Sequence, residues 1–249
     1  MKHLVRLYYV TMYYASWFWF GFVGLGLNIC CALLLRFPRT ERLQRRARAA
    51  IKRAFDLWTR WFHACGVLRI SWKGFPREMP PGTVYVANHP SLLDATILMS
   101  RMPDSFCIFK PALMKNPCIA PAALLAGYLS GAPDADTLRR AATKVAGGQG
   151  LLVFPEGTRT QRGERLGAFQ PGFALIAQRA NAPIQTLVIR SSPGLVTRGR
   201  PWWAAPAQLP ATWEVSFGRH WPADPTRSAR VLAEEIHRDL LSQVTAPVT

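Results

Sequence analysis

The sequence predicts an α/β fold: a mostly parallel central sheet flanked by helices, with an N-terminal membrane-associated helical segment. From about residue 66 onward, short apolar runs typical of buried strands alternate with helical stretches. Before them, residues 7–35 contain no charged residue, and the stretch that follows is densely basic. We therefore expect two parts: residues 1–65, which form a membrane-embedded segment and a basic amphipathic helix, and residues 66–249, which form one globular domain.

Length and composition narrow the class of partner. A chain of 249 residues buries one substantial core. Its 31 Lys and Arg residues against 14 Asp and Glu give a net charge of +17, which calls for an anionic partner: nucleic acid, a membrane surface or an acidic substrate. Because 49% of the residues are hydrophobic, we favour the membrane surface and expect no nucleic acid. The five cysteines lack a Cys-x-x-Cys pair, so we expect reduced thiols and no metal site.

Residues 7–35 are long enough to cross a hydrocarbon core as a helix. Gly21, Gly24 and Gly26 interrupt the apolar run near its middle. Two interpretations stay open: one tilted spanning helix, or two shorter helices that enter and leave the same leaflet. The length, the aromatic content and the lack of a clear small-residue cleavage site argue against a cleaved signal peptide.

The basic stretch that follows has the spacing of an amphipathic helix. Its apolar residues recur three or four positions apart, which places them on one face. In one interpretation the apolar face packs on the globular domain and the charged face is solvated. In the other the helix lies on anionic lipid, and the two interpretations are compatible. The excess of arginine places this side of the membrane in the cytoplasm. The apolar positions are Leu43, Ala47, Ile51, Ala54, Trp58, Trp61, Phe62 and Cys65.

The alternation after residue 66 predicts six strands and five helices. The expected strands are Leu68–Trp72, Thr83–Ala87, Phe106–Phe109, Leu151–Phe154, Ile184–Ile189 and Trp213–Phe217. The expected helices are Leu92–Arg101, Asn116–Leu129, Ala135–Ala146, Gly172–Ala180 and Thr226–Val244.

The motif Asn88-His89-Pro90-Ser91-Leu92-Leu93-Asp94 directly follows a predicted buried strand. Neutral histidine suits the activation of an alcohol, because its unperturbed pKa lies near working pH. A carboxylate on the far ring nitrogen would orient such a base. A helix that begins near Pro90 would let Asp94, one turn on, reach back to His89. The alternative is that Ser91 and Asp94 only cap that helix.

A second strand, Leu151–Phe154, leads into Pro155-Glu156-Gly157-Thr158-Arg159. A cation beside a flexible glycine turn is suited to hold an anionic head group, because the arginine fork binds phosphate oxygens bidentately. The alternative is that Glu156 and Arg159 pair with each other. Backbone amides near Gly157, or at the helix start after His89, are candidate donors to an oxyanion. No Gly-x-Ser-x-Gly elbow is present, which argues against an acyl-serine enzyme.

His-x4-Asp followed by Phe-Pro-Glu-Gly-Thr-Arg resembles the glycerolipid acyltransferases of the 1-acylglycerol-3-phosphate type, over roughly residues 65–200. The resemblance implies a membrane-bound O-acyltransferase that moves a fatty acyl group from an acyl-CoA or acyl carrier protein thioester to a lysophospholipid or related anionic lipid. It implies no cofactor, and it makes residues 66–249 the catalytic domain. It assigns catalysis to His89 and Asp94 and substrate binding to Asn88, Lys110, Glu156, Gly157, Thr158 and Arg159.

One departure bears on the acceptor. The middle block of the family commonly ends in an arginine that helps hold the acceptor phosphate. The equivalent stretch here, residues 127–134, has none, and the next arginines are Arg139 and Arg140. A specialised lipid acceptor is therefore an alternative to a lysophospholipid. Two other classes also stay open: a thioester hydrolase that activates water with the same base, and a membrane-anchored binding protein. We expect the catalytic domain to face the cytoplasm from the inner membrane.

Overall fold

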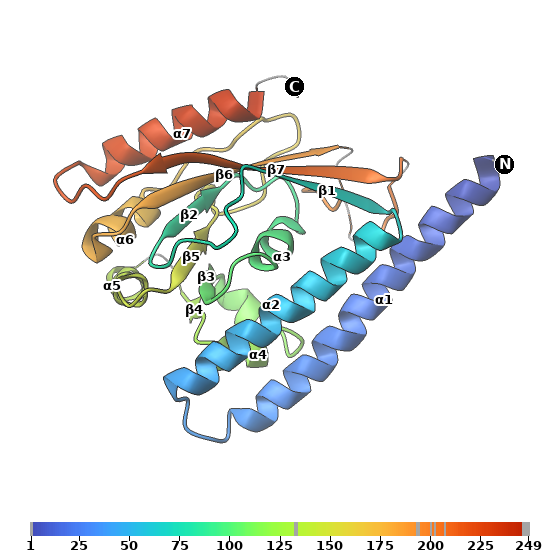
Figure 1. Ribbon diagram of the computed structural model, residues 1–249, viewed down its shortest axis with the longest axis horizontal. Coiled ribbons are helices and arrows are strands. Elements are labelled where there is room, and N and C mark those ends of the chain that lie inside the picture. Colours follow the sequence, from blue (N-terminus) through green and yellow to red (C-terminus); the bar gives the residue numbers. More distant parts are fainter. Residues whose placement is uncertain are drawn as a thin grey trace.

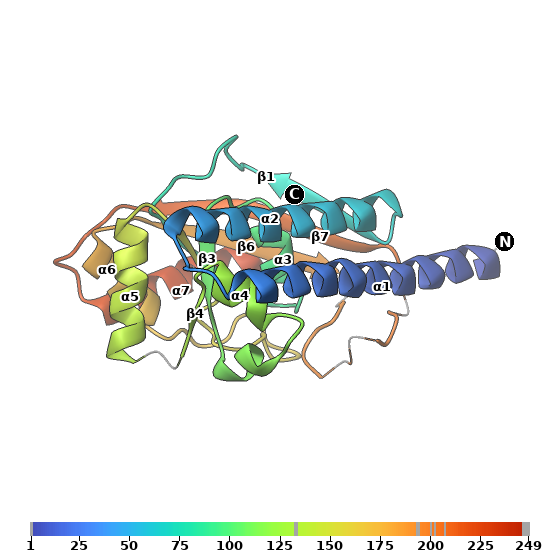
Figure 2. The same ribbon diagram turned by 90° about the horizontal axis from the view of Figure 1, so that it is seen from below.

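The computed structural model describes residues 2–131, 134–192, 195–199, 201, 203–206 and 208–245. Its first two helices, α1 (Lys2–Leu34) and α2 (Glu41–Ala64), form an antiparallel hairpin that lies along one side of an α/β domain (Figures 1 and 2). The Thr40 side chain caps α2 by accepting a hydrogen bond from the Leu43 amide. The predicted basic amphipathic helix is confirmed as α2.

The domain is built on one seven-stranded sheet, in the order β1-β7-β6-β2-β5-β3-β4. Five of the six strand pairs are parallel, and β6 and β7 pair antiparallel. The prediction of a mostly parallel sheet is therefore confirmed. The strands are β1 (Leu68–Lys73), β2 (Val84–Ala87), β3 (Ser105–Phe109), β4 (Leu129–Ser130), β5 (Gly150–Val153), β6 (Ile184–Ser192) and β7 (Ala211–Trp221).

The helices cover both faces of the sheet. Crossovers between parallel strands are right-handed, so the direction of each step along the sheet sets the face that its helix takes. The chain steps one way through β2, β3 and β4, which places α3 (Asp94–Met99) and α4 (Ala120–Leu125) on the face that also carries the hairpin. It returns through β5 to β6, which places α5 (Ala135–Ala146) and α6 (Gly172–Ala180) on the other face, beside α7 (Ala229–Thr245) (Figure 1).

The predicted helix over residues 116–129 is wrong in part. Only α4 is α-helical there, a short 3-10 helix (Pro111–Lys115) precedes it, and Leu129 belongs to β4. Gly127 has φ +74°, a conformation that ends a helix, and the two residues of β4 then pair with Ile108 and Phe109 of β3. Ala132 and Pro133 of the middle block lie outside the described residues.

The hairpin packs on the domain and is hydrogen-bonded to it. Helix α1 runs without a break through its three glycines, so the interpretation as two shorter helices within residues 7–35 is wrong. The buried side of α1 bonds to the domain: the Asn28 amide donates to Cys118 O (2.6 Å) and accepts from Ala122 N (3.0 Å). In α2, buried Arg48 pairs with Glu41 and Asp104 and donates to Ala126 O.

The opposite side of α1 is apolar and exposed. His3–Leu34 is, within the described chain, the helix that is long and apolar enough to cross a membrane. Its outward side chains include aromatic residues that a water-exposed helix rarely carries together. The large exposed hydrophobic residues of α1 are Leu4, Val5, Leu7, Tyr8, Tyr14, Phe18, Trp19, Phe22, Leu25, Ile29, Leu33 and Leu34.

Candidate functional site

The two sequence motifs meet at the carboxyl edge of the sheet. His89 follows β2 and Glu156 follows β5, and these neighbouring strands pair in parallel with Val86 opposite Val153. The loop after β2 leads to α3 on one face, whereas the loop after β5 leads towards α6 on the other. Open α/β sheets bind ligands beyond the carboxyl ends of their strands at such a reversal.

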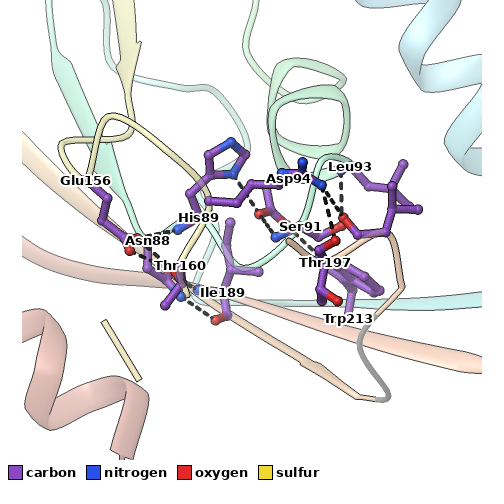
Figure 3. A network of polar contacts seen from close by, with 12 residues as sticks. Asn88, His89, Ser91, Leu93, Asp94, Glu156, Thr160, Ile189, Thr197 and Trp213 are labelled. Atoms are coloured by element: carbon purple, nitrogen blue, oxygen red, sulfur yellow. Dashed lines mark hydrogen bonds and ion pairs between the residues drawn. The ribbon is translucent and has the colours of Figure 1, made fainter. Parts of the chain in front are cut away.

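A hydrogen-bonded pair lies at the centre of this edge (Figure 3). His89 Nδ1 is 3.0 Å from Asp94 Oδ2, and the imidazole stacks on Phe154 with ring centroids 4.1 Å apart. Asp94 is the first residue of α3 and its side chain is fully buried. Burial raises the pKa of its carboxyl, while hydrogen bonds from His89, the Ser91 amide and the Trp213 indole act in the opposite direction.

The Glu156 side chain forms hydrogen bonds with other residues of the protein. Its carboxylate accepts from the His89 amide (2.8 Å), from Thr160 Oγ1 and from the Gly167 amide (2.9 Å). The Thr160 amide in turn donates to His89 O at 2.8 Å. These contacts hold the backbone of His89 against the turn after β5. The alternative interpretation, a pair between Glu156 and Arg159, is not among the contacts of the described residues.

Asn88 also bonds to the protein rather than to an open surface. Its amide donates to Ile189 O (2.8 Å) and accepts from Ile189 N (2.7 Å), which prolongs the ladder between β2 and β6. The side chain is 2% exposed. Ser91 is equally buried, and its hydroxyl donates to Leu195 O at 2.7 Å in the loop after β6. Both residues fix the segment that carries His89 (Figure 3).

The turn after β5 exposes groups that remain available to a ligand. Gly157 has φ +65°, and its amide is used by Phe154 O, so this expected oxyanion donor is already bonded. Within the described chain, the amides of Thr158 and Arg159 carry no hydrogen bond. Arg159 donates through Nη1 to Val196 O and Thr197 O, and among the described residues nothing bonds its Nε or Nη2, so these atoms can bind an anion. The turn thus presents two amides and one half-buried cation.

Lys110 directly follows β3, the strand next to β5, and is exposed. It therefore lies at the same sheet edge as the turn that carries Arg159. Arg139 and Arg140 lie further off, on α5, whose preceding strand β4 is three places from β2 in the sheet. Arg139 pairs with Asp136 at 2.6 Å, and both arginines are mostly exposed.

Sequence reasoning missed Trp213, whose indole donates to Asp94 Oδ1 at 3.0 Å. It belongs to β7, 119 residues along the chain, so no local motif connects it to Asp94. Thr160 and Gly167 were missed for a related reason: they act through Glu156, after the motif has ended. A buried carboxylate in need of donors is the signal that points to such residues, and it becomes visible only in the fold.

Comparisons with known proteins match the part of the chain that carries both motifs. A model of the family described as acyltransferase matches residues 75–190, which include both motifs. The 1-acyl-sn-glycerol-3-phosphate acyltransferase BAT2 of Brassica napus chloroplasts is 31% identical over 121 residues, 47% of this chain and 35% of that protein. The Helicobacter pylori 1-acyl-sn-glycerol-3-phosphate acyltransferase is 33% identical over 113 residues, 43% of this chain and 48% of that protein.

The fold as a whole also has a solved counterpart. The crystal structure of the 1-acyl-sn-glycerophosphate acyltransferase PlsC from Thermotoga maritima superposes with a TM-score of 0.67 at 20% identity, over 99% of this chain and 100% of that one. The match therefore includes the N-terminal hairpin. By contrast, the chain spans only about a third to a half of the length of the curated relatives that it matches.

Proposed function

We propose that this chain, whose residues 75–190 match the acyltransferase family model, is an O-acyltransferase that moves a fatty acyl group from a thioester to a hydroxyl of a lysophospholipid or related anionic lipid. The donor is acyl-CoA or acyl carrier protein. The observation that carries the proposal is the His89–Asp94 pair at the sheet edge where β2 and β5 end. Beside it lies the turn after β5, which offers a cation and free amides.

In the proposed reaction His89 is the general base. Its Nδ1 faces Asp94, so Nε2 takes the proton of the acceptor hydroxyl while that oxygen attacks the thioester carbonyl. The tetrahedral intermediate then collapses: the carbon–sulfur bond breaks, and the proton on Nε2 goes to the departing thiolate. Atoms and charge balance without a protein nucleophile, and Asp94 stabilises the imidazolium that forms between the two steps.

The turn after β5 supplies the remaining groups. We assign oxyanion stabilisation to the free amides of Thr158 and Arg159, since the turn that carries them is bonded to both the N–H and the C=O of His89. The free edge of the Arg159 guanidinium, with Lys110, binds the anionic group of the acceptor. Asn88, Glu156 and Gly157 act on substrate indirectly, because they shape the turn and hold the backbone of His89.

Membrane attachment is part of the proposal. Helix α1 packs lengthwise on α2 and α4, so a transverse orientation would draw the charged helix α2 towards hydrocarbon, which is costly. The exposed apolar face of α1 instead enters one leaflet from the cytoplasmic side, and the arginines of α2 meet anionic head groups. The active-site edge then lies where lipid acceptors and cytoplasmic thioesters meet.

The test is acyl transfer by purified full-length protein with the His89→Ala and Asp94→Asn variants. We expect His89→Ala to lose activity and Asp94→Asn to lose orders of magnitude in kcat, because the imidazole loses its orienting charge. His63→Ala, on α2 and away from the pair, is the control. Labelled acyl donor distinguishes the outcomes: labelled lipid product supports transfer, whereas free fatty acid that forms equally without acceptor would identify a hydrolase instead.

A further inference from the structure

The buried carboxylate of Asp94 has a third donor that the motif does not contain. Its Oδ2 faces His89 Nδ1 (3.0 Å) and accepts from the Ser91 amide (2.6 Å), while its Oδ1 accepts from the Trp213 indole at 3.0 Å. Trp213 is 1% exposed and Asp94 fully buried, so water does not reach this contact. Both oxygens are thereby satisfied, one by the motif itself and the other by β7 alone (Figure 3).

The sheet explains why this donor is a tryptophan. Strand β7 is two places from β2 in the sheet, about 10 Å at the usual strand spacing, with β6 between them. A long side chain is needed to place a donor across β6, and the indole also fills the space it crosses. Trp213 lies opposite Ser191 of β6 and Ile70 of β1, on the buried face of β7, and it lies outside residues 75–190.

The donor matters because the state of the carboxylate decides which nitrogen of His89 is free. An ionised Asp94 accepts from Nδ1 and leaves Nε2 unprotonated, which is the form that takes a proton. A neutral Asp94 donates to Nδ1 instead and leaves the ring proton on Nε2, where it blocks that role. Burial alone favours the neutral acid, and each donor to the carboxylate favours the ion.

We propose that Trp213 is a positioning residue for the reaction: its indole N–H holds Asp94 as the oriented carboxylate that keeps Nε2 of His89 free. The inference rests on the proposed function. The charged or titratable group that faces Asp94 is His89, and the other groups on the carboxylate are the Ser91 amide and the indole. The carboxylate of Glu156 meets His89 only at its backbone amide.

The matched pair of variants is Trp213→Phe and Trp221→Phe. Both residues are buried on β7, but the Trp221 indole nitrogen has no hydrogen-bond partner in the described structure. In Trp213→Phe we expect the acid limb of the kcat/KM profile to move to higher pH by roughly one unit, the size of a hydrogen bond to a charged group. Activity should recover towards the wild-type plateau at high pH. Trp221→Phe should leave the midpoint unchanged.

A second readout does not depend on catalysis. Diethyl pyrocarbonate modifies only unprotonated imidazole, so mass spectrometry of the His89 peptide across pH reports when Nε2 becomes free. Its midpoint should rise in Trp213→Phe and not in Trp221→Phe. If Trp213→Phe fails to fold, benzothienylalanine at position 213 keeps the ring shape and replaces N–H by sulfur, and the same shift is expected.

The outcomes separate the two proposals. A shifted modification midpoint in protein that transfers no acyl group would overturn the proposed function and leave the role of Trp213 intact. An active Trp213→Phe protein whose activity falls equally at all pH values, with no shift in modification, would show that the indole only packs and would overturn the inference.

Discussion

At the scale of single residues, two carboxylates hydrogen-bond to different groups of one histidine. Asp94 acts on the imidazole ring and Glu156 on the backbone amide of the same residue. The two carboxylates differ in their contacts because they reach His89 from different parts of the fold. Asp94 begins α3 five residues beyond His89, whereas Glu156 follows the neighbouring strand β5 and meets the main chain of His89. Loss of either carboxylate should therefore affect the rate, for different reasons.

The role of Glu156 gives a prediction. In Glu156→Gln an amide NH₂ replaces one acceptor oxygen, so at least one of the donors at His89, Thr160 or Gly167 loses its bond. We expect the free energy of unfolding to fall by about 1–3 kcal/mol, and kcat to fall while both Michaelis constants stay nearly constant. Glu164→Gln, exposed in the same loop, is the control. A rise confined to the Michaelis constant of the acceptor would show instead that Glu156 contacts substrate.

For Arg159 we expect a change in a Michaelis constant rather than in kcat. Arg159→Lys keeps the charge but loses the fork that bonds Val196 O and Thr197 O while offering a free edge to an anion. Steady-state kinetics should show a rise in the Michaelis constant of the acceptor of about tenfold, larger than any change for the thioester. Arg162→Lys, exposed three residues on, should change neither constant. If only the thioester constant rose, Arg159 would bind the phosphates of the donor.

At this scale the sequence predicted the site residues that share a motif and missed the site residues that lie outside the motifs. His89 and Asp94 are five residues apart, within reach of local reasoning. Trp213 reaches Asp94 only because β7 folds back beside β6. The sequence predicted that Asn88 and Glu156 bind substrate directly, and that role stays a prediction. Their contacts with Ile189 and with the His89 amide favour an indirect role.

At the scale of elements, strands proved easier to predict than their order. Each of the six short apolar runs predicted as strands after residue 66 became a strand, because burial in a largely parallel sheet selects such runs. The two residues of β4 carry no such pattern, and the first of them, Leu129, was predicted as the end of a helix. The strand order depends on contacts between segments that lie far apart in the sequence. This order puts β2 next to β5 and so brings His89 beside Glu156.

The α1–α2 hairpin depends on a residue that composition alone would assign to the surface. Among the many arginines of α2, Arg48 is 2% exposed and bonds Glu41, Asp104 and Ala126 O. The sequence predicted a solvated charged face for this helix, which holds for Arg45 and Arg53 but not for Arg48. Its guanidinium joins α2 to the turn before β3 and to the end of α4.

Arg48→Ala should therefore loosen the hairpin. It removes a buried aliphatic stem and leaves Ala126 O without its donor, and we expect a loss of about 1–3 kcal/mol in unfolding free energy. The ion pairs add little to this figure because Glu41 and Asp104 are partly exposed and regain water. Thermal unfolding in detergent measures the change, with Arg45→Ala as the control. Equal melting temperatures for the two variants would contradict the role of Arg48.

At the scale of the whole molecule, charge and apolar surface are arranged together. The net charge of +17 predicted an anionic surface as partner. The fold places many of the cations on α2, which lies alongside α1 (Figure 1), and α1 carries the exposed apolar side chains. Because Asn28 and Arg48 tie both helices to the domain, attachment of the hairpin to a membrane also sets the orientation of the catalytic edge.

The last prediction tests which of these surfaces holds the membrane. In full-length protein we would replace Phe18, Phe22 and Leu25 by glutamine, since these side chains are 75%, 65% and 48% exposed and support no core contact. The wild type should stay on vesicles in 1 M salt and need detergent for release, because burial of apolar surface is not screened by ions. The triple variant should bind only through its cations and leave the vesicles as salt rises, since screening shortens their reach to about 3 Å at 1 M.

The control for this experiment is the triple variant with Phe18→Leu, Phe22→Leu and Leu25→Ile, which should bind like the wild type because the face stays apolar. Unchanged, salt-resistant binding of the glutamine variant would show that another surface embeds the protein. Release of the wild type by salt alone would show that α1 lies outside the bilayer, and the cations of α2 would then carry the whole attachment. In either case the position of the active site relative to lipid would follow from the surface so identified, because the hairpin and the catalytic edge belong to one packed body.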